Sequence, residues 1–288
     1  MGAQILGVLF DGFAYGMLLF LLSVGLSVTL GLMNFINLAH GAFAMIGGYV
    51  AVTMMNYLGW PFLASLPVAF IAAAVISVLL ERTLFRRLYK SDPLQQVLFT
   101  IGLVFVISAI VAYLFSTAVQ PVRVPDYLRG SIVAFDYTFG VYRIFLIAVA
   151  LVITALLVGT LEYTRFGAMV RAAVDNQRMA SGLGINVESV FAITFALGSG
   201  LAGLGGALAI EIVGLDPSFA FHYLVYVLIV VAVGGLGSIR GSFVAATLLG
   251  VGDVAGKYYV PELGAFLIYV LMIGILFFIP LGLFGKRA

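Results

Sequence analysis

The stretch that decides the fold is SVFAITFALGSGLAGLGGALAI, residues 189–210. It carries no charged residue and has the roughly 20-residue length that an α-helix needs to cross a bilayer. Small residues recur along it at helical spacing, and such stripes let membrane helices approach one another closely. We therefore expect a spanning helix that packs on its neighbours through four small residues: Gly198, Ala202, Gly203 and Gly206.

The rest of the chain has the composition of a membrane protein. Of its 288 residues, 64% are hydrophobic and only 9% are charged, against roughly 25% charged residues in a soluble domain. The mean hydropathy is +1.21, and so few polar residues are too few to cover a soluble globule. The chain has no cysteine, which excludes disulfides, thiol chemistry and cysteine-type zinc sites and leaves the redox compartment open.

Apolar segments of spanning length recur along the chain. They are residues 11–31, 39–57, 62–80, 97–115, 142–160, 189–210 and 264–283, with two shorter pieces at 223–236 and 241–256 joined by GGLGSIRG. The two short pieces either cross the membrane fully or form a re-entrant hairpin. The sequence thus predicts an all-α fold, a polytopic transmembrane helical bundle of about eight or nine spanning or re-entrant helices.

The basic residues predict which way the bundle faces. Ten fall on one set of loops: Arg82, Arg86, Arg87, Lys90, Arg165, Arg171, Arg178, Arg240, Lys286 and Arg287. The opposite set holds four: Arg123, Arg129, Arg143 and Lys257. The positive-inside rule makes the first set cytoplasmic and places the N-terminus outside. The longest outer loop, about residues 116–141, is expected to serve as a docking surface.

No motif for nucleotide or metal binding stands out. The nearest approach to a P-loop is VGDVAGKY, in which Val251 replaces the first glycine and Tyr258 replaces the Ser or Thr. GSGLAG (198–203) matches a dinucleotide-binding spelling but lies inside a predicted membrane helix, not after a strand. His40 and His222 have no further ligand at metal-binding spacing. We expect no catalytic residue, no metal and no cofactor in this chain, so any ATP-driven work must come from a partner.

A polar break lies within the apolar segment LMNFINLAHGAF (32–43). Asn34, Asn37 and His40 follow one another at helical spacing and would share one face of a helix. Buried polar groups are costly unless satisfied, so these side chains either bond the break between two helices or line a translocation pathway. HGAF at 40–43 is echoed by RGSF at 240–243, which adds Arg240 as a pathway candidate.

The loop at 161–188 is expected to contain a short helix. Its apolar residues include Met169, Val170, Ala173 and Met179. Gly182 and Gly184 fit a helix C-terminus, and Asn186 fits the N-cap of the next helix. Such a helix is too short to span the membrane, so it either docks into a groove on another protein or lies on the membrane surface.

Three blocks together resemble a known family. LMNFINLAHGAFAMIGGYVA (32–51), GAMVRAAVDNQRMASGLGINVESVFAITFALGSGLAGLGGAL (167–208) and VGGLGSIRGSFVAATLLG (233–250) occur in one order and end with IPLGLFG (279–285). They are similar to the permease subunit of branched-chain amino acid ABC importers, the LivH type. The resemblance implies a single transmembrane permease domain over residues 1–288, multi-pass in the cytoplasmic (inner) membrane of a prokaryote. It also implies a transport subunit that is not itself an enzyme.

The resemblance also implies a site and partners. In this family a block of the cytoplasmic loop engages the ATPase, and here it falls on Arg171, Ala172, Asp175, Ala180, Gly184 and Ile185. The implied partners are a homologous second permease, two cytoplasmic ATPase subunits that bind ATP and magnesium, and an extracytoplasmic substrate-binding protein. The cargo would be a branched-chain or other hydrophobic amino acid.

Two alternatives stay open. Permeases for urea and short amides share the His-Gly block, and Ala42 stands where many relatives have an acidic residue, so the cargo is undecided. The second alternative is a channel or secondary transporter that needs no ATPase. A coupled carrier usually has ionisable residues in mid-span, and the predicted spans contain almost none.

Overall fold

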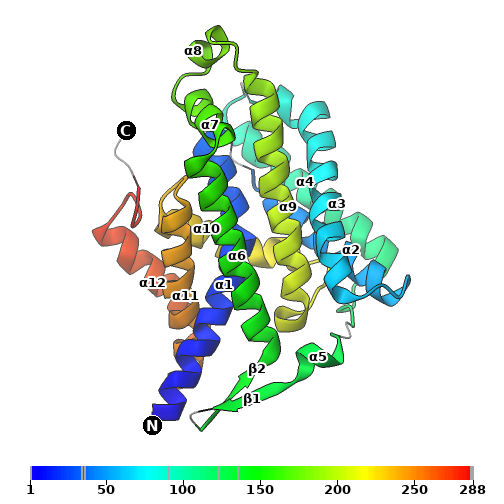
Figure 1. Ribbon diagram of the computed structural model, residues 1–288, viewed down its shortest axis with the longest axis vertical. Coiled ribbons are helices and arrows are strands. Elements are labelled where there is room, and N and C mark those ends of the chain that lie inside the picture. Colours follow the sequence, from blue (N-terminus) through cyan, green and yellow to red (C-terminus); the bar gives the residue numbers. More distant parts are fainter. Residues whose placement is uncertain are drawn as a thin grey trace.

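The computed structural model describes residues 2–33, 35, 37–89, 91–121, 124–134 and 136–285. Long helices run roughly parallel to the longest axis of the molecule (Figure 1). The elements are α1 (Gly2–Met33), α2 (His40–Asn56), α3 (Phe62–Thr83), η1 (Phe85–Arg87), α4 (Pro93–Phe115), α5 (Asp126–Arg129), β1 (Ser131–Ala134), β2 (Tyr137–Gly140), α6 (Val141–Tyr163), α7 (Arg165–Asp175), α8 (Gln177–Gly182), α9 (Val187–Val213), α10 (Phe219–Gly234), α11 (Ile239–Tyr259) and α12 (Gly264–Phe278).

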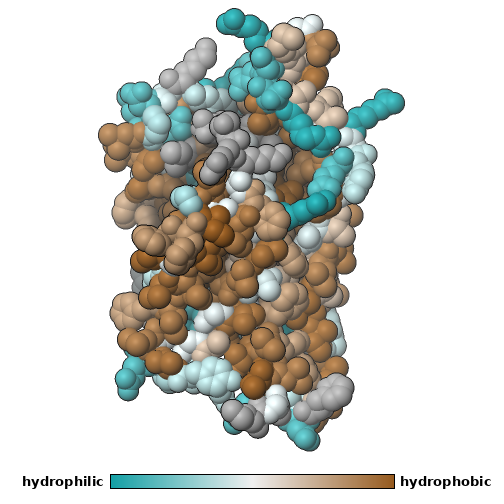
Figure 2. Space-filling view, turned by 90° about the vertical axis from the view of Figure 1, so that its left-hand side faces the viewer, coloured by the Kyte–Doolittle hydropathy of each residue, from teal (hydrophilic) through white to brown (hydrophobic). Residues whose placement is uncertain are grey.

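Six of these helices are long and apolar enough to cross a membrane. The spans are Gln4–Gly31, Phe62–Arg87, Pro93–Phe115, Val141–Tyr163, Val187–Val213 and Ile239–Tyr259. Shorter apolar helices accompany them, among them α10 and α12. Apolar side chains cover the middle of the molecule, and polar ones gather toward its two ends (Figure 2). The predicted polytopic helical bundle is therefore confirmed, with α11 a full-length helix and α10 a short one.

Helix α9 lies at the centre of the bundle, where it packs on α1, α2 and α3. Its four predicted packing residues are all buried, and the three glycines among them approach backbone atoms of neighbouring helices. A Cβ atom at Gly206 would lie 1.8 Å from the carbonyl oxygen of Ala44, and one at Gly198 would lie 2.8 Å from that of Gly25. Ala202 is fully buried. The structure thus places the predicted small-residue stripe where helix backbones touch.

Two short helices begin inside the bundle, not at a membrane surface. The His40 Nε2 atom, at the start of α2, lies 3.0 Å from the carbonyl oxygen of Leu22. Leu22 precedes the end of α1 by about three helical turns, or roughly 16 Å, so the chain returns into the bundle before α2 starts. Helix α10 begins at the same depth, since a Cβ atom at Gly41 would lie 2.3 Å from the carbonyl oxygen of Ala220.

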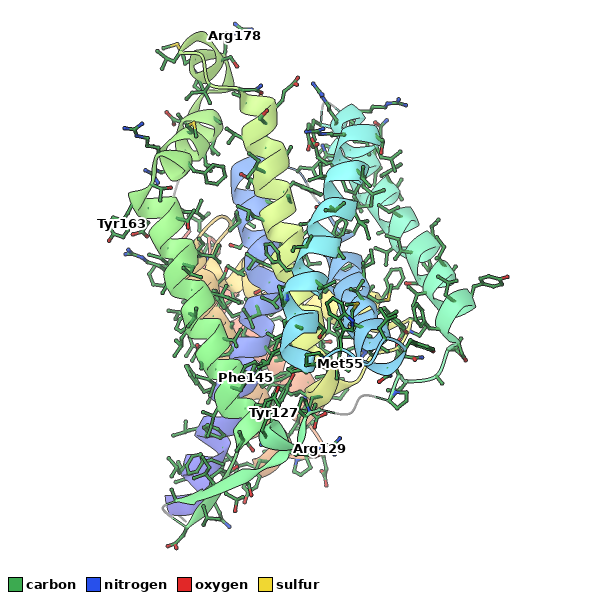
Figure 3. The ribbon with its side chains drawn as sticks, turned by 45° about the vertical axis from the view of Figure 1, so that its right-hand side comes forward. Met55, Tyr127, Arg129, Phe145, Tyr163 and Arg178 are labelled. Atoms are coloured by element: carbon green, nitrogen blue, oxygen red, sulfur yellow. The ribbon has the colours of Figure 1, made fainter. Side chains whose placement is uncertain are left out.

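The described basic residues separate toward the two ends of the molecule as the sequence predicts. Arg178 lies at one end and Arg129 at the other (Figure 3). The N-terminus lies beside the β1–β2 hairpin at the Arg129 end, where the Tyr137 hydroxyl donates a 3.0 Å hydrogen bond to Asp11. We call the α7–α8 end cytoplasmic and the hairpin end outer. Four of the counted basic residues lie outside the described part of the chain: Lys90, Arg123, Lys286 and Arg287.

The outer loop carries regular structure that the sequence does not predict. Strands β1 and β2 pair antiparallel, with Ser131 opposite Gly140 and Ala134 opposite Tyr137. Asp136 in the turn between them has a φ of +59°, a conformation that Asp tolerates better than most residues. Strands of four residues are too short for their alternation to be recognised in sequence. The outer loop expected at about 116–141 therefore contains a hairpin, with α5 before it.

The topology gives a labelling prediction. Asn176 and Asp126 are both exposed, and they lie beyond opposite ends of the membrane spans. A cysteine at 176 should react with an impermeant maleimide only from the cytoplasmic side, and one at 126 only from outside. Because the natural chain has no cysteine, each variant reports one position. Labelling of position 176 from outside in sealed cells would show that the orientation is the reverse of the one assigned here.

Candidate functional site

The 161–188 loop forms two short helices that project from the cytoplasmic end (Figure 1). We call α7 and α8 together the arm (Arg165–Gly182). The Thr164 side chain caps α7 by accepting a 3.3 Å hydrogen bond from the Gly167 amide. The Asn176 side chain accepts from Met179 N at 2.9 Å and so starts a second helix. The predicted single helical stretch is therefore divided at Asn176, because an Asn that caps the second helix leaves the helical conformation.

The arm is fixed to α9 by an apolar contact. Val170 and Ala173 of α7 are buried against Val190 and Phe191 at the start of α9. These residues include part of the apolar face that the sequence assigns to a partner or to the membrane surface. In the structure that part is used within the chain, so α7 and the cytoplasmic end of α9 form one packed unit. Only the far part of the arm remains available to a partner.

The tip of the arm and the residue that follows it expose two large apolar side chains beside polar ones such as Arg178. Met179 is 67% exposed and Leu183 is 80% exposed. Ala180 points inward, and its carbonyl oxygen accepts from Ile185 N at 3.1 Å. Gly184 has a φ of +83°, as the sequence predicts for a glycine after a helix. A surface with Met and Leu side chains on a short rigid helix suits insertion into an apolar groove.

The charged candidates of the loop differ in their roles. Arg171 turns back and donates a hydrogen bond to the carbonyl oxygen of Leu161, one of the unpaired carbonyls in the last turn of α6. Arg171 therefore ties the arm to α6. Asp175 is exposed at the last residue of α7, and Ala172 is half-buried beside it. Arg171 and Asp175 lie four residues apart on α7 and are both exposed, so both stay predicted contacts for a partner.

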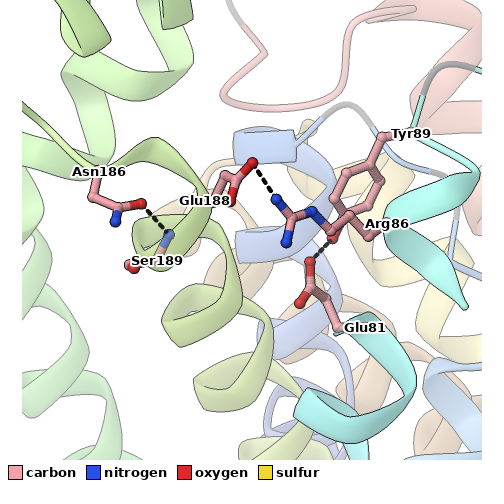
Figure 4. Close-up of polar contacts among 6 residues, drawn as sticks. All are labelled: Glu81, Arg86, Tyr89, Asn186, Glu188 and Ser189. Atoms are coloured by element: carbon pink, nitrogen blue, oxygen red, sulfur yellow. Dashed lines mark hydrogen bonds and ion pairs between the residues drawn. The ribbon is translucent and has the colours of Figure 1, made fainter. Parts of the chain in front are cut away.

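A polar cavity lies beside the arm on the cytoplasmic side. It encloses about 630 Å³, and its lining includes Gln177 at the start of α8 and Val187 at the start of α9. Arg86 forms an ion pair with Glu188 across it, and the Tyr89 hydroxyl donates a 2.8 Å hydrogen bond to Glu81 (Figure 4). Burial raises the pKa of Tyr89, and the Glu81 carboxylate raises it further. Tyr89 is therefore a neutral donor, and the ion pair connects η1 to the start of α9.

The pathway candidates do not all lie together. The side chains of Asn37 and His40 are buried at the start of α2, where Asn37 Oδ1 accepts from Ala39 N at 3.1 Å. Asn37 Nδ2 and His40 Nδ1 have no hydrogen-bond partner among the described residues. Arg240 instead lies at the cytoplasmic surface, where it forms a 2.7 Å ion pair with Glu162. Asn34 lies outside the described residues.

Sequence reasoning misses a charged group inside the bundle. Asp253 on α11 is 1% exposed and forms a 2.5 Å ion pair with Lys257 one turn later. Both belong to VGDVAGKY, the segment that resembles a P-loop, and in the structure this segment is helical. A helix cannot wrap around a phosphate as a P-loop does. The i, i+4 spacing of an acid and a base in an apolar segment is the signal that could have identified the pair.

These features define a polytopic transport subunit with a cytoplasmic helical arm. The model of the family described as "Branched-chain amino acid transport system / permease component" matches residues 8–276. The chain belongs to this family. It is a multi-pass protein of the cytoplasmic membrane.

Named relatives cover almost the whole chain. It is 28% identical to the high-affinity branched-chain amino acid transport system permease protein LivH of Escherichia coli K12, over 96% of this chain and 94% of the relative. It is 28% identical to the permease protein BraD of Pseudomonas aeruginosa, over 96% and 95%. The E. coli permease protein LivM is 25% identical over 81% of this chain and 60% of its own length. No solved structure matches the chain significantly.

Proposed function

We propose that the chain is one permease subunit of an ATP-driven (ABC) importer that carries branched-chain or similar hydrophobic amino acids. The observation that carries this proposal is the arm, a rigid helical projection with Met179 and Leu183 exposed at its tip. Large apolar side chains exposed on a projecting helix are typical of a surface that a partner covers. The arm suits the groove of an ATPase subunit, which would bind ATP and magnesium while this chain performs no catalysis.

The packing supports a path for the movement. Val170 and Ala173 fix the arm to the start of α9, and α9 touches α2 through glycine and alanine. A displacement of the arm would therefore move α9 as a unit against the polar break at His40. Alternating access would follow when the bundle changes from one packing to the other.

The proposed assembly contains more than this chain. It joins the chain to a homologous second permease, as LivH and LivM are both named permease proteins of one E. coli system. Two ATPase subunits would hold the arms, and a binding protein outside the membrane would deliver the cargo. The outer hairpin and α5, which lie beside the outer ends of α1 and α6 (Figure 1), offer a folded surface for that delivery.

Uptake by the reconstituted complex tests the proposal. Proteoliposomes that hold this chain with its second permease, ATPases and binding protein should accumulate leucine, isoleucine or valine only when ATP is supplied. Accumulation of urea in place of amino acids would favour the amide permease. Uptake driven by a proton or sodium gradient, without ATP and by this chain alone, would favour the secondary transporter, for which the buried Asp253 is a candidate coupling residue.

A further inference from the structure

A cavity on the outer side is lined by charged residues that the docking of an ATPase on the arm does not explain. It encloses about 290 Å³ between α1, α6, α9, α10 and α11, near the lower limit of roughly 300 Å³ for small-molecule pockets. Two ion pairs line it, Asp11 with Arg143 at 2.5 Å and Asp253 with Lys257 at 2.5 Å. Ionised groups facing lipid are costly, so this cavity must open to water or protein.

The position of the cavity is that of an entry site. Arg143 belongs to the first turn of α6, Lys257 to the last turn of α11, and Val213 is the last residue of α9. All three helix ends lie on the outer side. Asp253 precedes Tyr259, the last residue of α11, by six residues, which corresponds to about 9 Å along the helix axis. A molecule that arrives from outside would meet this cavity before the polar break at His40.

Asp253 has an unused acceptor. Its Oδ2 atom pairs with Lys257, whereas its Oδ1 atom is buried with no hydrogen-bond partner among the described residues. Leaving one oxygen of a buried carboxylate without a donor costs free energy. A Lys ammonium group has three donors, so Lys257 has hydrogen atoms left for a second acceptor. The pair therefore presents one free acceptor and free donors side by side.

The charges and the walls of the cavity point to one ligand chemistry. The two acids and two bases sum to zero charge, which favours a net-neutral ligand over a cation or an anion. The rest of the lining is formed by four aliphatic residues, Ala14, Ile212, Val213 and Val254, and by four aromatic ones, Tyr15, His222, Tyr223 and Tyr226. A zwitterion with an aliphatic side chain matches both surfaces.

We propose that this cavity binds an aliphatic α-amino acid during import, an assignment that rests on the proposed function and names a site within it. The ammonium group of the ligand donates to Asp253 Oδ1, and Lys257 donates to its carboxylate. Asp253 and Lys257 then each have two partners of opposite charge, one another and one charged group of the ligand. The aliphatic side chain packs on Ile212 and Val213, whose volume limits the size of the cargo.

Asp253→Asn tests the polar half of the site in the reconstituted complex. It should lower the initial rate of ATP-driven leucine uptake about tenfold or more, because one charge-assisted hydrogen bond to the ligand is lost. Glu262→Gln, which removes an exposed carboxylate near the outer end of α12, is the matched control and should transport as wild type.

Val213→Phe tests the apolar half without depending on protein yield. The larger ring narrows the cavity, so leucine uptake should fall more than valine uptake and the ratio of the two should drop several-fold. An unchanged ratio, or wild-type leucine uptake by Asp253→Asn, overturns the site. If Asp253→Asn does not assemble, the ratio in Val213→Phe decides. If the wild-type complex imports leucine with ATP and the variants import it equally well, only the proposed site is refuted. If the wild-type complex shows no ATP-driven leucine uptake, the proposed function is refuted as well.

Discussion

Gly203→Leu should remove most of the folded protein from the membrane. A Cβ atom at Gly203 would lie 2.5 Å from the Cβ atom of Ala73 and 3.0 Å from the carbonyl oxygen of Ala69 on α3. On its other side Gly47 of α2 approaches so closely that a Cβ atom there would lie 2.2 Å from the Gly203 carbonyl oxygen. A leucine would force α9 away from both helices, and overpacking of this kind costs about 1–3 kcal/mol or more. Size-exclusion chromatography of detergent extracts measures the loss.

A glycine in open space provides the control. Gly102 lies within α4, where an added Cβ atom meets nothing within 4 Å. Gly102→Leu should therefore give a normal yield of monodisperse protein. Normal yield and uptake in Gly203→Leu would show that α9 does not depend on close backbone contact with α2 and α3.

Gly184→Val should lower the substrate-stimulated ATP hydrolysis of the complex while leaving the membrane bundle intact. Gly184 has a φ of +83°, a region that a β-branched residue adopts only at a cost of about 1–2 kcal/mol. A valine there would shift the turn that joins α8 to α9 and misplace the arm tip. We expect substrate-stimulated ATP hydrolysis by the reconstituted complex to fall about tenfold, as for a change near 1.4 kcal/mol in an equilibrium.

Gly184→Asn separates backbone conformation from side-chain bulk. Nothing lies within 4 Å of an added Cβ atom at this position, so strain and not collision should decide the result. Asn adopts positive φ more readily than other residues, and its variant should keep most of the stimulation. Equal coupling in Gly184→Val and the wild type would mean that the turn does not position the arm.

Much of the fold follows from the sequence because spanning helices need long apolar segments. The expected span at 189–210 lies within α9, and that at 62–80 lies within α3. The depth at which α2 and α10 begin was not predictable in this way. It depends on contacts such as His40 with Leu22, which join residues distant in sequence and leave hydropathy unchanged.

The candidate site was predictable where local chemistry determines it. Gly184 and Asn186 mark the ends of helices through their own backbone and side-chain preferences, and the structure has the Asn186 side chain accept from Ser189 N at 3.0 Å. The burial of Val170 was not predictable, because an apolar face looks the same in sequence whether α9 or another protein covers it. Asp253 was missed because one acid in an apolar segment changes its mean hydropathy little.

Two ion pairs on the cytoplasmic side resist separation less than the contacts around α9 do. Arg86 with Glu188 and Arg240 with Glu162 are largely exposed, so each contributes at most about 1 kcal/mol, and salt at physiological strength screens charges beyond about 8 Å. At Gly198 and Gly206, by contrast, α9 packs directly on the backbone of α1 and α2, with no room for even a Cβ atom. A pull on the arm would therefore break these ion pairs before α9 separates from α1, α2 and α3, so the cytoplasmic face would open first while α9 moves together with the arm.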